Sequence, residues 1–401
     1  MQQEQVLTRS QPAAALQAGD HLPKHVNIVS TPSSAKHKRT MAASQPPKHT
    51  LTLSPNQHSS PLRTQTTTPS YLPAAKQTHS HPRGTTTSKD EDAHLRFIGT
   101  ATTILEWRGI RILTDPNFLH AGDHVHLGPG VTGTRLTNPA IDLEDLPNID
   151  VVLLSHYHAD HFDQKVEDEL RRDLPIITTP HAKENLVDKK DGEERFTAVK
   201  DLDFWEAATL NITPSSSSAD ANATEPVPVI KVTGMPGKHI PPGPLSVAND
   251  LLAAVPPTNG WMVELGYSSP GGLVGGSLEE FSCGYRIYIS GDTLFVPELN
   301  DIATKYTHAG KEIDLMLIHL GGTTIPSPKV PLLMVTMDAQ QGVKLMQLVK
   351  PDVTVPVHFD DYDVFVDPLE NFKKAVEEAG LSGGVVYLDR GEGYGFGVRR
   401  G

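Results

Sequence analysis

The sequence has a single cysteine, Cys283, among its 401 residues. One thiol excludes an intrachain disulfide framework and a thiolate-rich metal site. No apolar run reaches the roughly 20 residues that a membrane-spanning helix needs, and the first residues lack the apolar core of a secretory signal. An excess of positive charge is also absent, since the formal net charge is −13. A protein that binds nucleic acid through its phosphate backbone is therefore not indicated.

Residues 1–92 have few large apolar side chains and no hydrophobic period, and are rich in Ser, Thr, Pro, Gln and His. Such a segment cannot bury enough apolar surface to offset the entropy lost on ordering. We therefore predict a disordered basic tail over 1–92 and a folded domain over 93–401. A mitochondrial transit peptide is an alternative for the tail, but no amphipathic arginine-bearing helix is evident. We expect a cytoplasmic protein.

The folded part alternates strand-like and helix-like segments, which indicates an α/β protein. Segments 95–98, 103–107 and 110–114 are separated by turn residues and predict an antiparallel meander. Further strands are expected at 150–154, 175–179, 227–233, 260–266, 285–289, 313–318 and 353–357. Helices are expected at 163–172, 296–306 and 338–349, with a last one that begins at Asp367-Pro368 and ends at Gly380.

One segment directly after the strand at 150–154 carries His156, His158, Asp160 and His161. Imidazole and carboxylate groups are good ligands for divalent metals of the zinc type. Alternation along a strand would send the first two histidines to the same side. The last two residues can then turn toward a second point. The segment predicts the start of two adjacent metal sites, and a polar turn rich in histidine is the alternative.

Three later strand ends supply single residues of the same kinds. His239, Asp292 and His358 each follow a predicted strand. Each is weak evidence by itself, but together with the first cluster they become candidate metal ligands. Asp115 ends another strand, and we expect its carboxylate to orient a ligand histidine.

The segment Phe118–Pro147 is expected to be a long irregular loop, and loops of this length are often functional lids. It carries His124 and His126, which could reach a substrate. Because a histidine in a surface loop is more often simply solvated, we leave both out of the metal set. His181 and His319 are expected to be structural.

The order of these motifs resembles the metallo-β-lactamase-fold hydrolase superfamily, from about residue 94 to the C-terminus. The resemblance implies a four-layer αβ/βα sandwich, in which two mixed β-sheets are flanked by helices. It also implies two divalent metal ions, with zinc expected and manganese or iron as alternatives. One ion would be held by His156, His158 and His239, the other by Asp160, His161 and His358, with Asp292 bridging them.

The resemblance further implies a metal-dependent hydrolase that attacks a carbonyl or phosphorus centre with a metal-bridging hydroxide. Asp160 would be the catalytic residue that orients this hydroxide or moves its proton. The expected substrate is a small ester, lactone or phosphodiester. Peripheral contact with a membrane stays open, no nucleic-acid partner is expected, and the sequence does not indicate an oligomeric state.

Within the superfamily, the chain looks most like the branch of L-ascorbate-6-phosphate lactonase and N-acyl-phosphatidylethanolamine-hydrolysing phospholipase D. The supporting segments are 97–103, 113–116 and 146–150. Near Met337 the phospholipase carries a histidine where this chain has methionine, and this difference counts against a lipid-specific function. Alternatives from other classes are a phospholipase D-like enzyme on lipid headgroups, an iron-dependent oxygenase on the same fold, a nuclease and a non-catalytic binding protein.

Overall fold

The computed structural model describes residues 46–400, apart from a set of internal segments. These segments are 56–58, 66, 85–89, 129–130, 190–193, 214–225, 241–242, 244–248, 250–254, 270–280 and 328–329. About half of the predicted tail, residues 1–45, lies outside the described residues.

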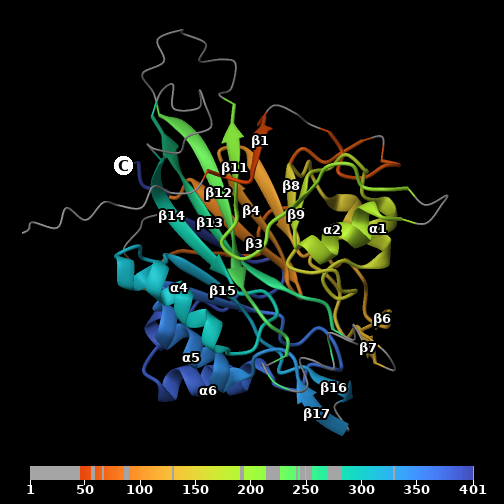
Figure 1. Cartoon of the computed structure of the whole chain (residues 1–401), viewed down its shortest axis with the longest axis vertical. Helices are drawn as coiled ribbons and strands as arrows, with labels where there is room; N and C mark the ends of the chain where they lie inside the picture. Colours follow the sequence, from red (N-terminus) through yellow and green to blue (C-terminus); the bar gives the residue numbers. More distant parts are fainter. Residues whose placement is uncertain are drawn as a thin grey trace, which may run out of the picture. The chain divides into compact units, whose positions relative to one another are not determined.

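Two large mixed β-sheets form the centre of the described part (Figure 1). The seven-stranded sheet has the order β1 (His49–Leu53), β11 (Ala207–Ile212), β12 (Val227–Pro236), β13 (Asn259–Ser268), β14 (Phe281–Ile289), β15 (Leu315–His319) and β18 (Val353–Val357). The eight-stranded sheet has the order β10 (Val199–Asp201), β9 (Ile176–Thr178), β8 (Val151–Leu153), β5 (Ile110–Thr114), β4 (Thr102–Trp107), β3 (Ala93–Gly99), β19 (Gly393–Phe396) and β2 (Thr78–His79). The predicted meander is confirmed, since β3, β4 and β5 pair in antiparallel order.

Helices cover the outer face of each sheet (Figure 1). Next to the eight-stranded sheet lie α1 (Gln164–Glu169) and α2 (Pro180–Val187). Against the seven-stranded sheet lie α4 (Asn300–Lys305), α5 (Ala339–Val349) and α6 (Leu369–Glu378). Short 3₁₀ turns occur at Leu143–Asp145, Pro297–Leu299, Thr307–Ala309 and Ser382–Gly384.

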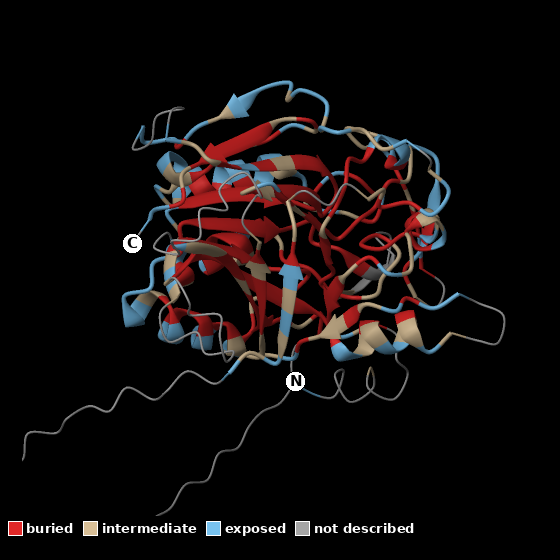
Figure 2. Ribbon diagram, turned by 90° about the horizontal axis from the view of Figure 1, so that it is seen from above, coloured by how far each residue is buried: buried red, intermediate tan, exposed pale blue. Residues whose placement is uncertain are grey.

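Three layers of apolar side chains separate the four layers of secondary structure. The largest lies between the sheets and joins residues such as Phe97 and Val151 to Trp261 and Leu317. The second lies under α4–α6 and the third under α1 and α2. Figure 2 shows most of the central strands buried, while some peripheral strands and the outer faces of the helices are exposed. The expected four-layer αβ/βα sandwich is confirmed, because each sheet buries both faces.

Side chains at the predicted positions cap several helices. Asp163 accepts the amide of Val166 at the start of α1, and Asp338 caps α5 in the same way. Such caps satisfy amides that have no partner inside the helix. The last helix begins one residue later than expected, with Pro368 at the cap position. Asp367 instead accepts the amide of Ala339, so it links α6 to the start of α5.

Segments from 46–92 also take part in the sheets, although their composition predicts disorder. The edge strand β1 pairs in parallel with β11, and β2 pairs in parallel with β19. Leu53 and Leu62 are buried. Edge strands need only the free backbone groups of a neighbour. Short pieces without a strong hydrophobic pattern can therefore join the fold, which begins earlier than residue 93.

Two small hairpins extend from the sandwich (Figure 1). One is formed by β6 (His124–His126) and β7 (Thr132–Thr134), inside the segment that the sequence predicts to be an irregular loop. The other is formed by β16 (Thr324–Ser327) and β17 (Val330–Met334). Among the described residues, none of the helices combines the length and apolar character needed to span a bilayer.

Candidate metal centre

The predicted ligands follow the ends of four strands. β8 belongs to the eight-stranded sheet, whereas β12, β14 and β18 belong to the seven-stranded sheet. The last three run in the same direction, because they are related by two antiparallel steps and by parallel pairs, and side-chain contacts bring the end of β8 to the same edge of the sandwich. Residues far apart in the sequence therefore converge there.

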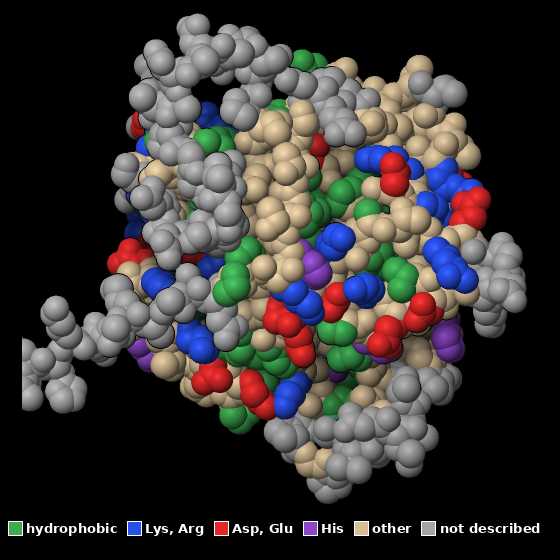
Figure 3. All heavy atoms as spheres, turned by 45° about the horizontal axis from the view of Figure 1, so that its top comes forward, with side chains coloured by type: hydrophobic (Ala, Val, Ile, Leu, Met, Phe, Trp, Pro, Cys, Tyr) green, Lys and Arg blue, Asp and Glu red, His purple; other side chains and the backbone are tan. Residues whose placement is uncertain are grey.

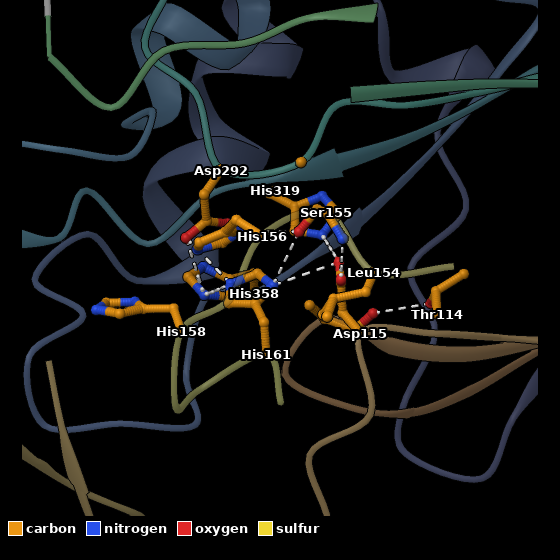
Figure 4. A network of polar contacts seen from close by, with 12 residues as sticks. Thr114, Asp115, Leu154, Ser155, His156, His158, His161, Asp292, His319 and His358 are labelled. Atoms are coloured by element: carbon orange, nitrogen blue, oxygen red, sulfur yellow. Dashed lines mark hydrogen bonds and ion pairs between the residues drawn. The ribbon is translucent and has the colours of Figure 1, made fainter. Parts of the chain in front are cut away.

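One buried group contains Asp160, His161, Asp292 and His358. Nε2 of His161 lies 3.1 Å from Oδ2 of Asp292 and 3.2 Å from Nε2 of His358. The His358 Nε2 atom lies 3.5 Å from Oδ2 of Asp160 and 3.5 Å from Oδ2 of Asp292. Figure 4 shows the two histidines and Asp292 facing one another. Donor atoms this close, from two imidazoles and two carboxylates, suit a single divalent cation.

A second group adjoins the first and contains His156, His158 and Asp160. The ring centroids of the two histidines are 5.6 Å apart. Nδ1 of His158 lies 2.9 Å from Oδ1 of Asp160. The ring of His239, which follows β12, lies 4.8 Å from that of His156. Asp160 thus stands between two sets of histidines.

Several buried polar atoms of these groups have no hydrogen-bond partner within the described part of the chain. They are Nε2 of His156, His158 and His239, and Oδ1 of Asp160 and Asp292. A buried polar atom without a partner costs about 1–3 kcal/mol. Five such atoms at the meeting point of the sheets are the pattern expected of ligands to a cation, and these donors fit a metal of the zinc type.

The opposite ring nitrogens are held by neighbouring groups. Nδ1 of His156 lies 2.9 Å from Oγ of Ser155, and Nδ1 of His239 lies 3.0 Å from the carbonyl oxygen of Val335. Such contacts fix the tautomer and the orientation of a metal-binding imidazole. No sequence signal pointed to Ser155 or Val335, since these contacts depend on the local geometry.

Electrostatics divide the histidines into two kinds. Burial lowers the pKa of His156 well below its usual range and that of His239 to about 4. Burial also opposes charge on His161, but Asp292, Asp160 and Asp115 outweigh it and raise the pKa of that ring well above its usual range. The pKa of Asp292 is held well below its usual range, because His161 and His358 outweigh the effect of burial.

His319 lies closer to this centre than the sequence predicted. It is buried at the end of β15, and its ring stacks on that of His161 with centroids 6.0 Å apart. Its Nε2 atom has no aligned hydrogen bond and lies 3.8 Å from Oδ2 of Asp115. The available signal was its position directly after a strand, which it shares with His358.

A cavity of about 790 Å³ adjoins the group that contains His158 and His239, both of which line it. Its wall combines apolar surface, including Phe204, with polar side chains, including Lys238. His181 lines the cavity as well, although we expected a structural role for it. Figure 3 shows basic and acidic side chains interspersed on one face of the molecule, without a surface of one sign.

The histidines of the β6–β7 hairpin are not brought to the centre. His124 and His126 are both exposed on β6, and neither belongs to a ligand-like group within the described residues.

Comparison with known proteins identifies relatives of the same kind. Residues 94–228 match the model of the beta-lactamase superfamily domain. A UPF0173 metal-dependent hydrolase of Archaeoglobus fulgidus is 25% identical over 272 residues, which cover 68% of this chain and 91% of that protein. The mitochondrial N-acyl-phosphatidylethanolamine-hydrolyzing phospholipase D of Saccharomyces cerevisiae is 28% identical over 129 residues, or 32% of this chain and 25% of that protein.

Solved structures share the fold. An isothiocyanate hydrolase from Delia radicum gut bacteria aligns with a TM-score of 0.54 and 17% identity, over 76% of this chain and 100% of that one. A possible metal-dependent hydrolase from Veillonella parvula aligns with a TM-score of 0.54 and 15% identity, over 76% of this chain and 98% of that one.

Proposed function

The chain is a metal-dependent hydrolase of the metallo-β-lactamase superfamily, and from this premise we propose that it cleaves a small ester, lactone or phosphodiester with two divalent metal ions. The observation that carries the proposal is the set of buried, unpartnered ring nitrogens on His156, His158 and His239, beside the packed group of Asp160, His161, Asp292 and His358.

We assign the ligands as the resemblance to the superfamily implies. His156, His158 and His239 would hold one ion, and Asp160, His161 and His358 the other. Asp292 would contact both, because its Oδ2 atom faces His161 and His358 while its Oδ1 atom has no partner. Zinc is the proposed metal, and manganese or iron would also suit these donors. Ions bound there would act as Lewis acids and lower the pKa of water toward neutrality.

Asp160 is the proposed catalytic residue. Its two oxygens face different histidines, 2.9 Å from His158 and 3.5 Å from His358. A carboxylate between the two ligand sets is placed to orient an attacking water and to accept its proton. The pKa of Asp160 is well below its usual range, because nearby histidines outweigh burial, so the group is ionised at neutral pH.

The cavity beside His158 and His239 is the proposed substrate site. A volume of about 790 Å³ accommodates a small molecule. Apolar side chains on its wall, such as Phe204 and Ile240, would hold the uncharged part of a substrate next to the proposed ions.

The test combines elemental analysis of the purified chain with a panel of lactones, carboxylic esters and phosphodiesters, with and without a chelator. We expect about two metal ions per chain and turnover that the chelator abolishes. Asp160→Ala and Asp292→Ala should lose activity by at least about a hundredfold, while His124→Ala, which changes an exposed histidine outside the centre, should not. Full turnover by either aspartate variant would refute the proposal.

A second candidate is hydrolysis of a phosphodiester in a lipid headgroup. The similarity to the yeast phospholipase favours it, although the match covers only 25% of that protein. The panel therefore includes vesicles that contain N-acyl-phosphatidylethanolamine. Faster turnover of that lipid than of soluble esters and lactones would support this candidate.

A further inference from the structure

A fully buried arginine follows the β6–β7 hairpin. The side chain of Arg135 is 0% exposed, and its ring neighbour is Tyr362, whose centroid lies 5.2 Å from the guanidinium carbon. Nε donates to the carbonyl of Thr137 at 3.0 Å. Nη1 donates to Oγ1 of Thr100 at 2.5 Å and to Oδ1 of Asn117 at 2.6 Å. A buried charge is tolerated only with such partners.

Asp361 is the counter-ion of this guanidinium and is also 0% exposed. Its Oδ1 atom lies 3.0 Å from Nη2 of Arg135, as an ion pair rather than an aligned hydrogen bond. Its Oδ2 atom accepts the amide of Thr100 at 2.8 Å. Arg390 adds a second cation, 3.0 Å from Oδ1. Arg135 and Asp361 therefore hold Thr100 by its side chain and its backbone together.

Thr100 in turn holds His358. The amide of His358 donates to the carbonyl oxygen of Thr100 at 2.8 Å. Both residues have left-handed backbone, with φ of 51° and 61°, which costs roughly 1–2 kcal/mol at a residue other than glycine. This conformation depends on surrounding contacts that enforce it. The backbone of His358 thus rests on the Arg135–Asp361 pair, while the carbonyl of Leu320 lies 3.1 Å from Nδ1 of its ring.

Asn117 links the guanidinium of Arg135 to the other side of the centre. Its Oδ1 atom accepts from Arg135, and its Nδ2 group donates to the carbonyl of Ala159 at 3.1 Å. Ala159 directly precedes Asp160. One arginine therefore supports the backbone beside two proposed ligands, Asp160 and His358. Both belong to the second proposed ion, while the ring contacts of His156 and His239 are made by Ser155 and Val335.

We propose that Arg135 is a positioning residue for the second metal site, and that it sets the affinity of Asp160, His161 and His358 for their ion without affecting the site of His156, His158 and His239. The inference rests on the proposed function, because it presumes two ions. The sequence suggests that the segment after β7 is part of a lid. Its proposed role is instead to hold the backbone of metal ligands in place.

The test is stepwise zinc binding to the full chain with Arg135→Lys, measured by competition with a chromogenic chelator. Lysine keeps the charge but cannot make the forked contacts to Thr100, Asn117 and Asp361. We expect the affinity of one of the two steps to fall about 10–100-fold, as for other groups that support metal ligands, while the other step stays unchanged. kcat should fall with little change in KM.

Arg286→Lys is the matched control. Arg286 is a nearly buried arginine of β14, paired with Glu264 at 2.9 Å, within the sheet rather than the centre. Its substitution should lower the free energy of unfolding but leave both zinc affinities unchanged. If Arg135→Lys does not fold, Asn117→Ala, which removes the contacts of Asn117 to Arg135, Ala159 and Tyr362, should show the same selective loss.

The outcomes separate the two proposals. A wild-type chain that binds no zinc or one zinc would overturn the proposed function. Two zinc ions in the wild type, with both affinities unchanged or equally weakened in Arg135→Lys and Asn117→Ala, would overturn the role of Arg135 alone.

Discussion

Oδ2 of Asp115, at the end of β5, lies 3.3 Å from Nδ1 of His161, the last histidine of the motif after β8. The other oxygen of this carboxylate accepts the amide of Ser155 at 2.6 Å. A residue in a neighbouring strand therefore fixes both the start of the motif and the orientation of one of its rings. Asp115 itself has a φ of 36°, a strained conformation that such contacts maintain.

Replacing Asp115 by asparagine should weaken zinc binding about 10–100-fold, because an amide orients and polarises the His161 ring less well than a carboxylate. Zinc titration measures the effect. Asp142→Asn is the control, since Asp142 pairs with an exposed histidine, His120, and neither belongs to a ligand-like group within the described residues. Equal zinc affinity in Asp115→Asn and wild type would contradict the role of this carboxylate.

The metal-free protein should lose stability as the pH falls from about 6.5 to about 4. Burial lowers the pKa of His239 to about 4, whereas the same group in the unfolded chain has a pKa of about 6.5. Between these values the unfolded state binds more protons, so the free energy of unfolding rises with pH by roughly 3 kcal/mol from this group. His161 acts in the opposite direction, since its raised pKa gives stability that is lost above pH 6.5.

Urea unfolding of the chelated protein at pH 5 and pH 6.5 measures this dependence. In His239→Gln the rise in the free energy of unfolding between the two values should be smaller than in wild type. An unchanged rise would show that His239 is not the neutral, buried group described here.

Gly291→Ala should disrupt the centre through the backbone. A Cβ atom at this position would lie 2.3 Å from the carbonyl oxygen of Asn259, and φ is +60°. The neighbouring Asp292 would have to move with the backbone. We expect a loss of at least about 2 kcal/mol in stability and a loss of bound zinc.

Gly310→Ala provides the comparison, because Gly310 has a similar φ of +72° with no atom within 4 Å of the added carbon. Gly310→Ala should lower the free energy of unfolding by about 1 kcal/mol, and the variant should retain its zinc. Denaturant unfolding and metal analysis of both variants separate the effect of the positive φ from the effect of the steric clash with Asn259. Two variants with equal stability and equal zinc content would contradict a steric clash at Gly291.

Lys350→Gly should stabilise the protein by about 0.5–1 kcal/mol. Lys350 ends α5 in the left-handed conformation, with φ of 49°, which glycine adopts without penalty. Lys344→Gly, at an exposed position inside the same helix, should instead cost about 1 kcal/mol. A denaturation midpoint that falls in both variants would exclude the stabilising effect.

Cys283 should react slowly with thiol reagents while the protein is folded. Burial raises the pKa of its thiol to about 12, so only a very small fraction is thiolate at pH 8. We expect labelling roughly 100-fold or more slower than in urea-unfolded protein. Labelling of the native chain at the unfolded rate would contradict the raised pKa of this partly buried thiol.

The sequence predicted the strands well where apolar runs are short and bounded by turn residues. The runs at β8, β9, β15 and β18 are buried on both faces, so their pattern is strong. The edge strands β1 and β2 could not be predicted, since their pairing uses backbone groups and few apolar side chains.

The candidate centre was predictable to a similar extent. Residues that follow strands, such as His239 and His358, could be recognised because strand ends converge in an α/β sandwich. Arg135 could not, since a single arginine in a loop gives no pattern and its partners Thr100 and Asp361 are distant in sequence. The closeness of His319 to the centre could not be predicted, because its contacts with Ser290 and Asp115 join residues that are distant in sequence.

Each proposed ion would draw its ligands from both sheets. The motif after β8 comes from one sheet, and His239 and His358 come from strands of the other. Bound zinc would then connect the two sheets of the sandwich. Ribosome-bound chains that end before β18 lack His358 and should accordingly bind at most one zinc ion. The zinc content of such chains would then show when the second sheet has packed against the first.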